Sequence, residues 1–123
     1  MKMKAISIKQ PWASLVASGE KTIETRRWPT KYRGDLVIVS SLLPKIDNLP
    51  LGQAIAIAEI YDCRPMCKDD EKNACCEIYP NAFSWHLRNI RYFAPFKIKG
   101  HLSLYDVDFP SNIQVFSRQY TCL

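Results

Sequence analysis

Glycine is scarce in this sequence, and long apolar runs are missing from it. The chain has only 4 glycines in 123 residues, which excludes collagen-like and glycine-rich low-complexity proteins. Its longest uncharged apolar run, residues 36–44, contains two serines and falls far short of the roughly 20 residues that a membrane-spanning helix needs. The N-terminus carries lysines but no apolar core segment of a secretory signal. We therefore expect a cytoplasmic protein without a membrane partner.

Cysteine is present, but no disulfide framework is expected. In a reducing compartment the 5 cysteines, at positions 63, 67, 75, 76 and 122, are predicted to be free thiols. Their spacing lacks the paired C-x2-C knuckles of common zinc sites, and the adjacent Cys75 and Cys76 are poorly placed to ligate one tetrahedral ion together. Zinc is therefore a minor alternative, and we predict no metal and no other cofactor.

The rest of the composition is typical of one folded domain. Hydrophobic residues make up 47% of the chain and charged residues 24%, which is too apolar for a disordered protein. The 8 prolines indicate many turns, and the length fits a single domain over residues 1–123. The sequence contains no repeat and no linker, and we expect a monomer.

Short strand-like segments dominate the chain after one helix near its start. Residues 3–9 alternate in polarity and predict a strand. Pro11 then favours the first turn of a helix, and Gly19 supplies its C-terminal stop. A short exposed helix is predicted over 68–77, and further strands over 22–25, 36–39, 53–61, 82–87, 90–96 and 101–107. The pattern predicts an α+β, mostly β fold: a small, mainly antiparallel barrel of five or six strands, with the early helix closing one end.

Positive charge is concentrated in two segments. Residues 20–33 hold five bases against two acids, and residues 86–105 hold four bases, no acids and several interleaved aromatic side chains. Bases can neutralise phosphates while aromatic rings stack on unpaired nucleobases. We therefore predict contacts with a nucleic-acid backbone at Arg27, Arg33, Arg88, Arg91, Lys97 and Lys99. In the alternative, the aromatic residues form the core and the bases are only the solvated faces of the same strands.

Residues 19–26, GEKTIETR, carry a specific pattern. They resemble the G-x-K-x-x-E-x-R signature of the ASCH domain (activating signal cointegrator homology), a branch of the PUA-like β-barrels. Flanking segments are similar to the family in the same order, at 7–13, 27–34, 52–63 and 96–107. The resemblance covers most of residues 3–107, and it implies a barrel of five or six strands with flanking helices and a cleft lined by the signature residues.

The resemblance also implies a function. ASCH family members bind RNA or other nucleic acids; some compact bacterial members are amidohydrolases acting on acylated cytidine, and others are described as ribonucleases. We therefore predict recognition of RNA or a nucleotide-like small molecule through a basic cleft. The ligand-binding residues expected from the family are Lys21, Glu24, Arg26, Trp12, Trp28 and Ser41.

The signature side chains have a chemistry of their own. A bend after Gly19 is needed to bring Lys21 beside Glu24 and Arg26, because positions 21 and 24 otherwise point to opposite sides of an extended segment. Together they would offer two cations for a phosphate and one carboxylate for an exocyclic amine such as that of cytosine. The alternative for Lys21 and Glu24 is an ordinary surface ion pair.

Two other function classes remain open at this stage. In the amidohydrolase branch the resemblance assigns catalysis to a lysine, a threonine three residues later and a glutamate on the central strand. Lys21 and Glu59 match, but Glu24 replaces the threonine and removes its hydroxyl. A ribonuclease would need a proton acceptor, for which His86 and His101 are the candidates. The third possibility is a protein-interaction module.

Overall fold

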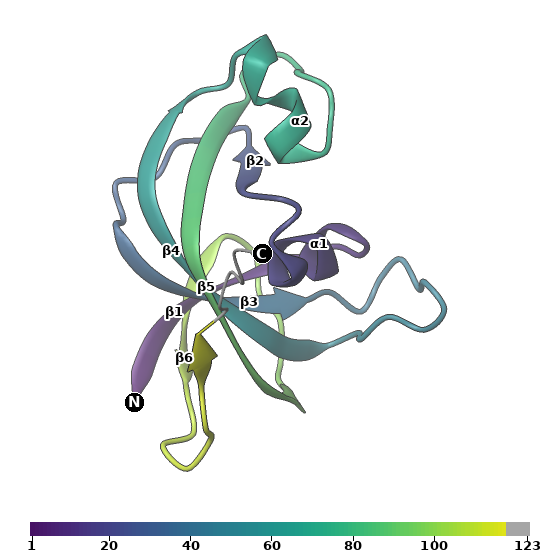
Figure 1. Ribbon diagram of the computed structural model, residues 1–123, viewed down its shortest axis with the longest axis vertical. Helices are drawn as coiled ribbons and strands as arrows, with labels where there is room; N and C mark the ends of the chain where they lie inside the picture. The colour runs from purple at the N-terminus through teal and green to yellow at the C-terminus, as the bar shows by residue number, and fades with distance from the viewer. Residues whose placement is uncertain (118–123) are drawn as a thin grey trace, which may run out of the picture.

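A curled mixed sheet carries the fold (Figure 1). The computed structural model describes residues 1–117. In chain order the elements are β1 (Lys2–Ile8), α1 (Trp12–Ser18), β2 (Ile23–Arg26), β3 (Gly34–Ser40), β4 (Gln53–Pro65), the 3-10 turn η1 (Lys68–Asp70), α2 (Glu71–Ala74), β5 (Phe83–Lys97), β6 (Leu104–Asp108) and β7 (Phe116–Ser117). None of the described helices is long and apolar enough to cross a membrane.

The sheet is a half-barrel rather than a closed barrel. Its strand order is β2-β5-β4-β3-β1-β6, with the short β7 also paired to β5. Within residues 1–117 the only parallel pair is β1 with β3, and the other pairs are antiparallel. The predicted mostly β fold with helices beside the sheet is therefore confirmed. The edge strands β2 and β6 are not paired with each other, so the expected closure is incomplete.

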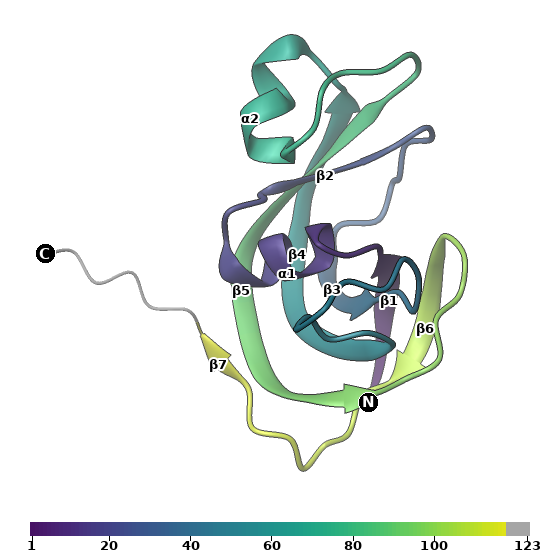
Figure 2. The same cartoon turned by 90° about the vertical axis from the view of Figure 1, so that its right-hand side faces the viewer.

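Alternating residues of the strands fill two separate cores. Ile6 and Ile38 belong to the cluster that also buries Ala13 and Val16 of α1, whereas Ala5 and Val37 belong to the cluster on the other face of the sheet. This division follows from the period of two in a strand, which sends neighbouring side chains to opposite faces. Helix α1 therefore lies against one face only, as Figure 2 shows.

Gly19 ends α1 and redirects the chain. Its φ is +86°, in the left-handed region that residues with a Cβ rarely adopt, and its amide bonds the Val16 carbonyl. The Lys21 amide then donates to the carbonyl of Leu15 at 3.0 Å. The chain therefore turns back along the helix before β2 begins at Ile23, which is the bend that the signature needs.

The predicted strands 82–87 and 90–96 were wrong as separate elements, because β5 runs through both. Asn89 bridges them with a φ of +54°, a conformation that asparagine tolerates better than most residues. The pairing with β4 shifts its register there, between Ile57 and Glu59, so the irregularity is a bulge rather than a turn.

Several predicted boundaries also move. The long strand β4 continues four residues beyond the predicted end at 61, and the last predicted strand begins at 104 rather than 101. The predicted helix over 68–77 is shorter, consisting of η1 and the single turn of α2. Residues 66–82, which connect β4 to β5, are hereafter called the cap. Figures 1 and 2 place α2 of the cap beside β2, at the end of the two long strands.

Candidate functional site

A cleft of about 1340 Å³ opens where the half-barrel is left unclosed. Its walls come from the ends of β1 and β3, the start of α1, strand β2, the cap, and the loop between β5 and β6. The basic residues that line it are Lys9, Lys21, Arg26, Lys97 and Lys99, and Glu24 is the only acidic side chain among the lining residues of the described chain. The cleft thus collects residues from distant parts of the sequence.

The three signature side chains meet in one wall of this cleft. Lys21 is 1% exposed and Glu24 is 6% exposed, and the Lys21 Nζ lies 3.6 Å from Glu24 Oε1. Arg26 donates from Nε and Nη2 to Glu24 Oε2, at 3.1 and 2.8 Å. The bend at Gly19 therefore brings together the residues that the sequence analysis expected to converge, and their burial rules out an ordinary surface ion pair.

Glu24 is fully engaged inside the protein. Its Oε2 accepts both Arg26 hydrogen bonds, and its Oε1 accepts the Thr25 amide at 3.1 Å and faces Lys21. A carboxylate offers about four acceptor positions, so little capacity is left for the exocyclic amine proposed from the sequence. Glu24 instead orients Arg26, which also donates from Nη2 to the Ser7 carbonyl at 3.0 Å. The Arg26 Nη1 has no hydrogen-bond partner within residues 1–117.

Two tryptophans stand at the cleft with their rings partly in solvent. Trp12 is 37% exposed and Trp28 is 43% exposed, and both line the cleft. The Arg26 guanidinium lies 5.9 Å from the ring centroid of Trp28, while the Trp28 carbonyl accepts a hydrogen bond from the buried Trp85 at 3.2 Å. The backbone of Trp28 is therefore held by the core while its ring remains accessible.

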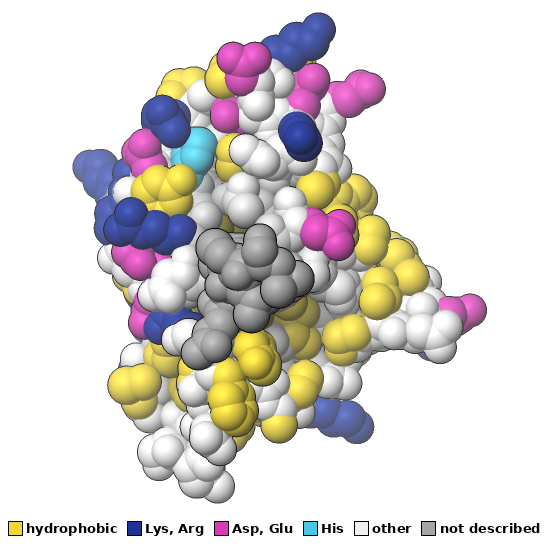
Figure 3. All heavy atoms as spheres, viewed as in Figure 1, with side chains coloured by type: hydrophobic (Ala, Val, Ile, Leu, Met, Phe, Trp, Pro, Cys, Tyr) yellow, Lys and Arg dark blue, Asp and Glu magenta, His cyan; other side chains and the backbone are white. Residues whose placement is uncertain are grey.

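The remaining rim combines lysines with apolar side chains. Lys9, Lys97 and Lys99 are exposed and line the cleft. Leu42 and Leu102, from the loops after β3 and β5, are 69% and 94% exposed and line it as well. Figure 3 shows hydrophobic side chains gathered near α1 and the projecting loop between β3 and β4. Sequence analysis missed Lys9, although it directly precedes the residues similar to the family's helix start.

Other predicted residues are divided between the cleft and the outside. Ser41 lines the cleft as predicted, and so does its neighbour Ser40, which is buried and bonds the backbone of Gln53. Arg27 and Arg33 lie outside the cleft lining: Arg27 lies over the Tyr79 ring, and Arg33 donates to nearby backbone carbonyls.

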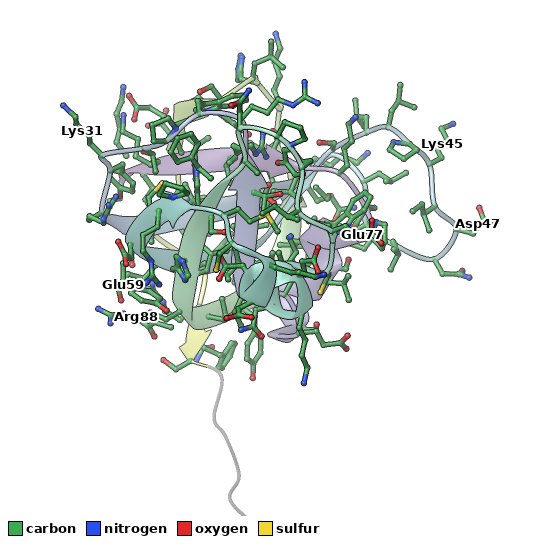
Figure 4. All side chains as sticks on the ribbon, turned by 90° about the horizontal axis from the view of Figure 1, so that it is seen from above. Lys31, Lys45, Asp47, Glu59, Glu77 and Arg88 are labelled. Carbon is green, nitrogen blue, oxygen red and sulfur yellow. The ribbon has the colours of Figure 1, made fainter. Side chains whose placement is uncertain are left out.

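Glu59 does not reach Lys21, so the predicted catalytic pair is not assembled. Its carboxylate accepts from Arg88 at 3.1 Å on the outer face of β4 and β5. Figure 4 shows Glu59 and Arg88 next to each other. The reason is strand parity: Ala58 and Ile60 face the core that contacts α1, so Glu59 points to the opposite face.

Arg88 and Arg91, for which contacts with a nucleic-acid backbone were predicted, are both paired with carboxylates of the protein. Arg91 donates to both carboxylate oxygens of Asp35, at 2.9 and 2.5 Å, and Arg88 is paired with Glu59. Figure 3 shows basic and acidic side chains interspersed on this side of the molecule. Each arginine is thus balanced by a carboxylate, and neither lines the cleft.

The Asp35–Arg91 pair predicts a pH dependence of stability. The hydrogen bond from Arg91 lowers the pKa of Asp35 below its ordinary value of 3.8. Because the folded-state pKa is depressed, the pair stabilises the fold above the unfolded pKa and loses this contribution as the pH falls through the folded one. We expect Asp35→Asn to flatten the fall of the unfolding free energy as the pH drops below about 4, measured by urea titration. An unchanged pH profile would contradict the assignment.

The two histidines have different surroundings. His101 lines the cleft, and its ring contacts Tyr105 edge-on with centroids 5.0 Å apart. His86 is 7% exposed and lies outside the cleft beside Arg64, with His86 Nε2 3.2 Å from Arg64 Nη2. Burial lowers the pKa of His86, and the Arg64 charge lowers it further. His101 alone of the two is placed to meet a cleft ligand.

The cysteines within residues 1–117 are free thiols, and Cys122 lies outside the described residues. Cys76 lines the cleft, where its Sγ is 3.7 Å from Thr25 Oγ1. The part of the chain that the structure describes contains no group of three or more His, Cys, Asp or Glu side chains arranged to hold a metal ion.

The curled sheet and the signature loop at its mouth define a PUA-like domain. The ASCH domain model matches residues 6–97, so the chain belongs to the ASCH domain family. This family is commonly linked to RNA binding. No curated protein matches the chain.

Solved structures support the same fold. The crystal structure of ASCH from Zymomonas mobilis superposes with a TM-score of 0.66 and 17% identity, covering 85% of this chain and 87% of that one. Two single-substitution variants of the Zymomonas mobilis protein each give a TM-score of 0.63, at 16% and 15% identity, covering 85% of this chain and 89% and 87% of theirs. At this level of identity the likeness concerns the fold alone.

Proposed function

We propose that this protein binds single-stranded RNA in the cleft between β2 and the loop after β5. The observation that carries the proposal is Arg26, which is held by Glu24 and the Ser7 carbonyl with Nη1 unpaired among the described residues, at a cleft that also holds two exposed tryptophans. A guanidinium fixed in this way suits a phosphate oxygen. The tryptophan rings suit unpaired nucleobases.

The size and charge of the cleft favour a polymer over a lone nucleoside. Small-molecule pockets usually measure roughly 300–1000 Å³, and this cleft is larger at about 1340 Å³. Its lining carries five Lys and Arg side chains against one carboxylate. The exposed lysines at positions 9, 97 and 99 would follow a phosphate backbone that extends beyond Arg26.

The hydrolase alternative has less support. Glu24 occupies the position of the family's catalytic threonine, and its oxygens are engaged with Arg26, Thr25 and Lys21. Glu59 lies on the other face of the sheet, paired with Arg88. The arrangement supports binding without turnover of acylated cytidine.

Salt dependence tests the proposal at the rim lysines. A labelled single-stranded RNA of about ten nucleotides, within the usual site size of such binders, is titrated at several salt concentrations. The logarithm of affinity should fall with the logarithm of salt by about 0.7 for each phosphate neutralised. Replacing Lys97 and Lys99 together by Ala should make this slope shallower by about 1.4, because two phosphate contacts are lost.

A matched variant controls for total charge. Lys31 and Lys45 are exposed and lie outside the cleft lining, and Figure 4 shows Lys45 on the projecting loop after β3. Replacing these two lysines removes the same charge and should leave the slope unchanged. Equal slopes for both double variants, or no measurable RNA binding by the unmodified protein, would refute the proposed function.

A further inference from the structure

Three successive carbonyls at the end of α2 accept hydrogen bonds from residues 12, 21 and 22, and residues 12 and 21 line the cleft. The Asn73 carbonyl accepts the Thr22 amide at 2.9 Å, and the Ala74 carbonyl accepts the Lys21 Nζ. The Cys75 carbonyl accepts Nε1 of Trp12 at 3.4 Å. The last carbonyls of a helix have no partner within the helix. The donors from residues 12, 21 and 22 therefore satisfy the carbonyls at the end of α2 from outside the helix.

Lys21 is the only charged donor in this set. Its side chain is buried, and the Nζ lies between the Ala74 carbonyl and the Glu24 carboxylate. A buried ammonium group needs such partners, because leaving it unpaired costs far more than an ordinary lost hydrogen bond. The amine of Lys21 is therefore committed to the protein rather than presented to the cleft.

The cap is also attached to β2 by apolar contacts. Ile23 of β2 packs with Met66, Ala74 and Ala82 of the cap in a cluster separate from the two sheet cores. The two alanines bury little area, but Ile23 and Met66 are larger and almost fully buried, so this cluster also holds the cap. The hydrogen bonds from residues 12, 21 and 22 add polar attachment at the end of α2, and Lys21 supplies its only charged donor.

The cap in turn forms one wall of the cleft. Cys76 and Tyr79 follow α2 and line the cleft, and Arg27 lies over the Tyr79 ring at 5.9 Å. A shift of the cap would move both side chains together. The position of this wall depends on how firmly the end of α2 is held.

We propose that Lys21 is a positioning residue: its ammonium group holds the cap against the signature loop and thereby sets the cleft wall formed by Cys76 and Tyr79. The second half of this statement rests on the proposed RNA binding, whereas the first half concerns the protein alone. Lys21 thus differs in role from Arg26, whose guanidinium is available to the ligand.

Amide hydrogen exchange tests the first half directly. The Thr22 amide is bonded to the Asn73 carbonyl, so its exchange rate reports whether the cap is attached. The Gly52 amide is bonded to the Ser40 carbonyl, so its exchange rate reports whether the half-barrel is folded. In Lys21→Ala, exchange at Thr22 should accelerate by about tenfold or more, while exchange at Gly52 stays unchanged. Lys21→Met, which keeps the bulk of the side chain, gives the same comparison if the alanine variant unfolds.

Chemical rescue separates positioning from a general loss of packing. Propylammonium has the atoms that Lys21→Ala removes, so adding it should restore slow exchange at Thr22 and RNA affinity in parallel. Tetramethylammonium at equal concentration lacks the N–H donors and should restore neither. Unchanged exchange at Thr22 in an intact barrel would overturn the proposal, as would rescue by both cations.

The RNA measurement distinguishes the two proposals from each other. If Lys21→Ala loses RNA affinity while exchange at the Thr22 amide stays normal, Lys21 contacts the ligand. That result overturns this inference and leaves the proposed function standing. If exchange at the Thr22 amide is fast in Lys21→Ala but the RNA affinity is unchanged, the cleft wall formed by Cys76 and Tyr79 has no role in RNA binding, and the second half of the proposal is refuted. If the unmodified protein binds no RNA, the proposed function fails, and the exchange at Thr22 still decides whether Lys21 holds the cap.

Discussion

Arg26→Ala should weaken RNA binding by about tenfold to a hundredfold, the range for losing hydrogen bonds from a charged group. The reason is that Glu24 and the Ser7 carbonyl fix the guanidinium, so the unmodified protein loses little side-chain entropy when it binds. Arg26→Lys keeps the charge but cannot reproduce the paired hydrogen bonds to Glu24, and it should recover only part of the loss. Fluorescence anisotropy with a labelled single-stranded RNA measures all three proteins.

Arg88→Ala is the matched control for this experiment. Arg88 is also an arginine paired with a glutamate, but it is exposed and lies outside the cleft. Its removal should change the affinity by less than about twofold because Arg88 does not line the cleft, and the fold should be little affected because exposed ion pairs contribute little to stability. If Arg88→Ala bound RNA more weakly than Arg26→Ala did, the RNA would have to bind on the outer face of β4 and β5 rather than in the cleft.

Trp85→Ala should lower the free energy of unfolding by about 3–5 kcal/mol, the usual cost of truncating a large buried aromatic side chain. Trp85 is completely buried in the core that contacts α1, and its Nε1 donates to the Trp28 carbonyl at 3.2 Å. Because whole domains are stable by only about 5–15 kcal/mol, this variant should be close to unfolding. Urea titration measures the change.

Trp28→Ala separates stability from binding. The Trp28 ring is 43% exposed, so its loss should cost less than about 1 kcal/mol of stability, as for most surface substitutions. RNA affinity should nevertheless fall by about 1–3 kcal/mol if a base stacks on the ring. A stability loss in Trp28→Ala as large as that in Trp85→Ala would show that the ring is a core residue.

Local patterns in the sequence determined much of the fold. Alternating polarity identified β1, the apolar run identified β3, and Gly19 marked the end of α1, because each of these features depends on a few consecutive residues. The same local patterns predicted two strands where β5 is one. Asn89 lies between them, and from the sequence alone an asparagine at a bulge within a strand cannot be distinguished from one in a turn between two strands. The signature at 19–26 identified the family and the wall of the cleft.

Only the tertiary structure decided which charges are available to a ligand. By their charge alone Arg88 and Arg91 are expected to face a ligand as Arg26 does, but Arg91 pairs with Asp35, 56 positions away, and Arg88 with Glu59, 29 positions away. Likewise, Lys21 is bound by the carbonyl of Ala74, which lies 53 residues away. Such pairs depend on strand register and on how the connection between β4 and β5 folds back, and no local pattern contains that information. The sequence by itself therefore determined the strands, the helix stop and the family, whereas long-range packing decided which cations face the cleft.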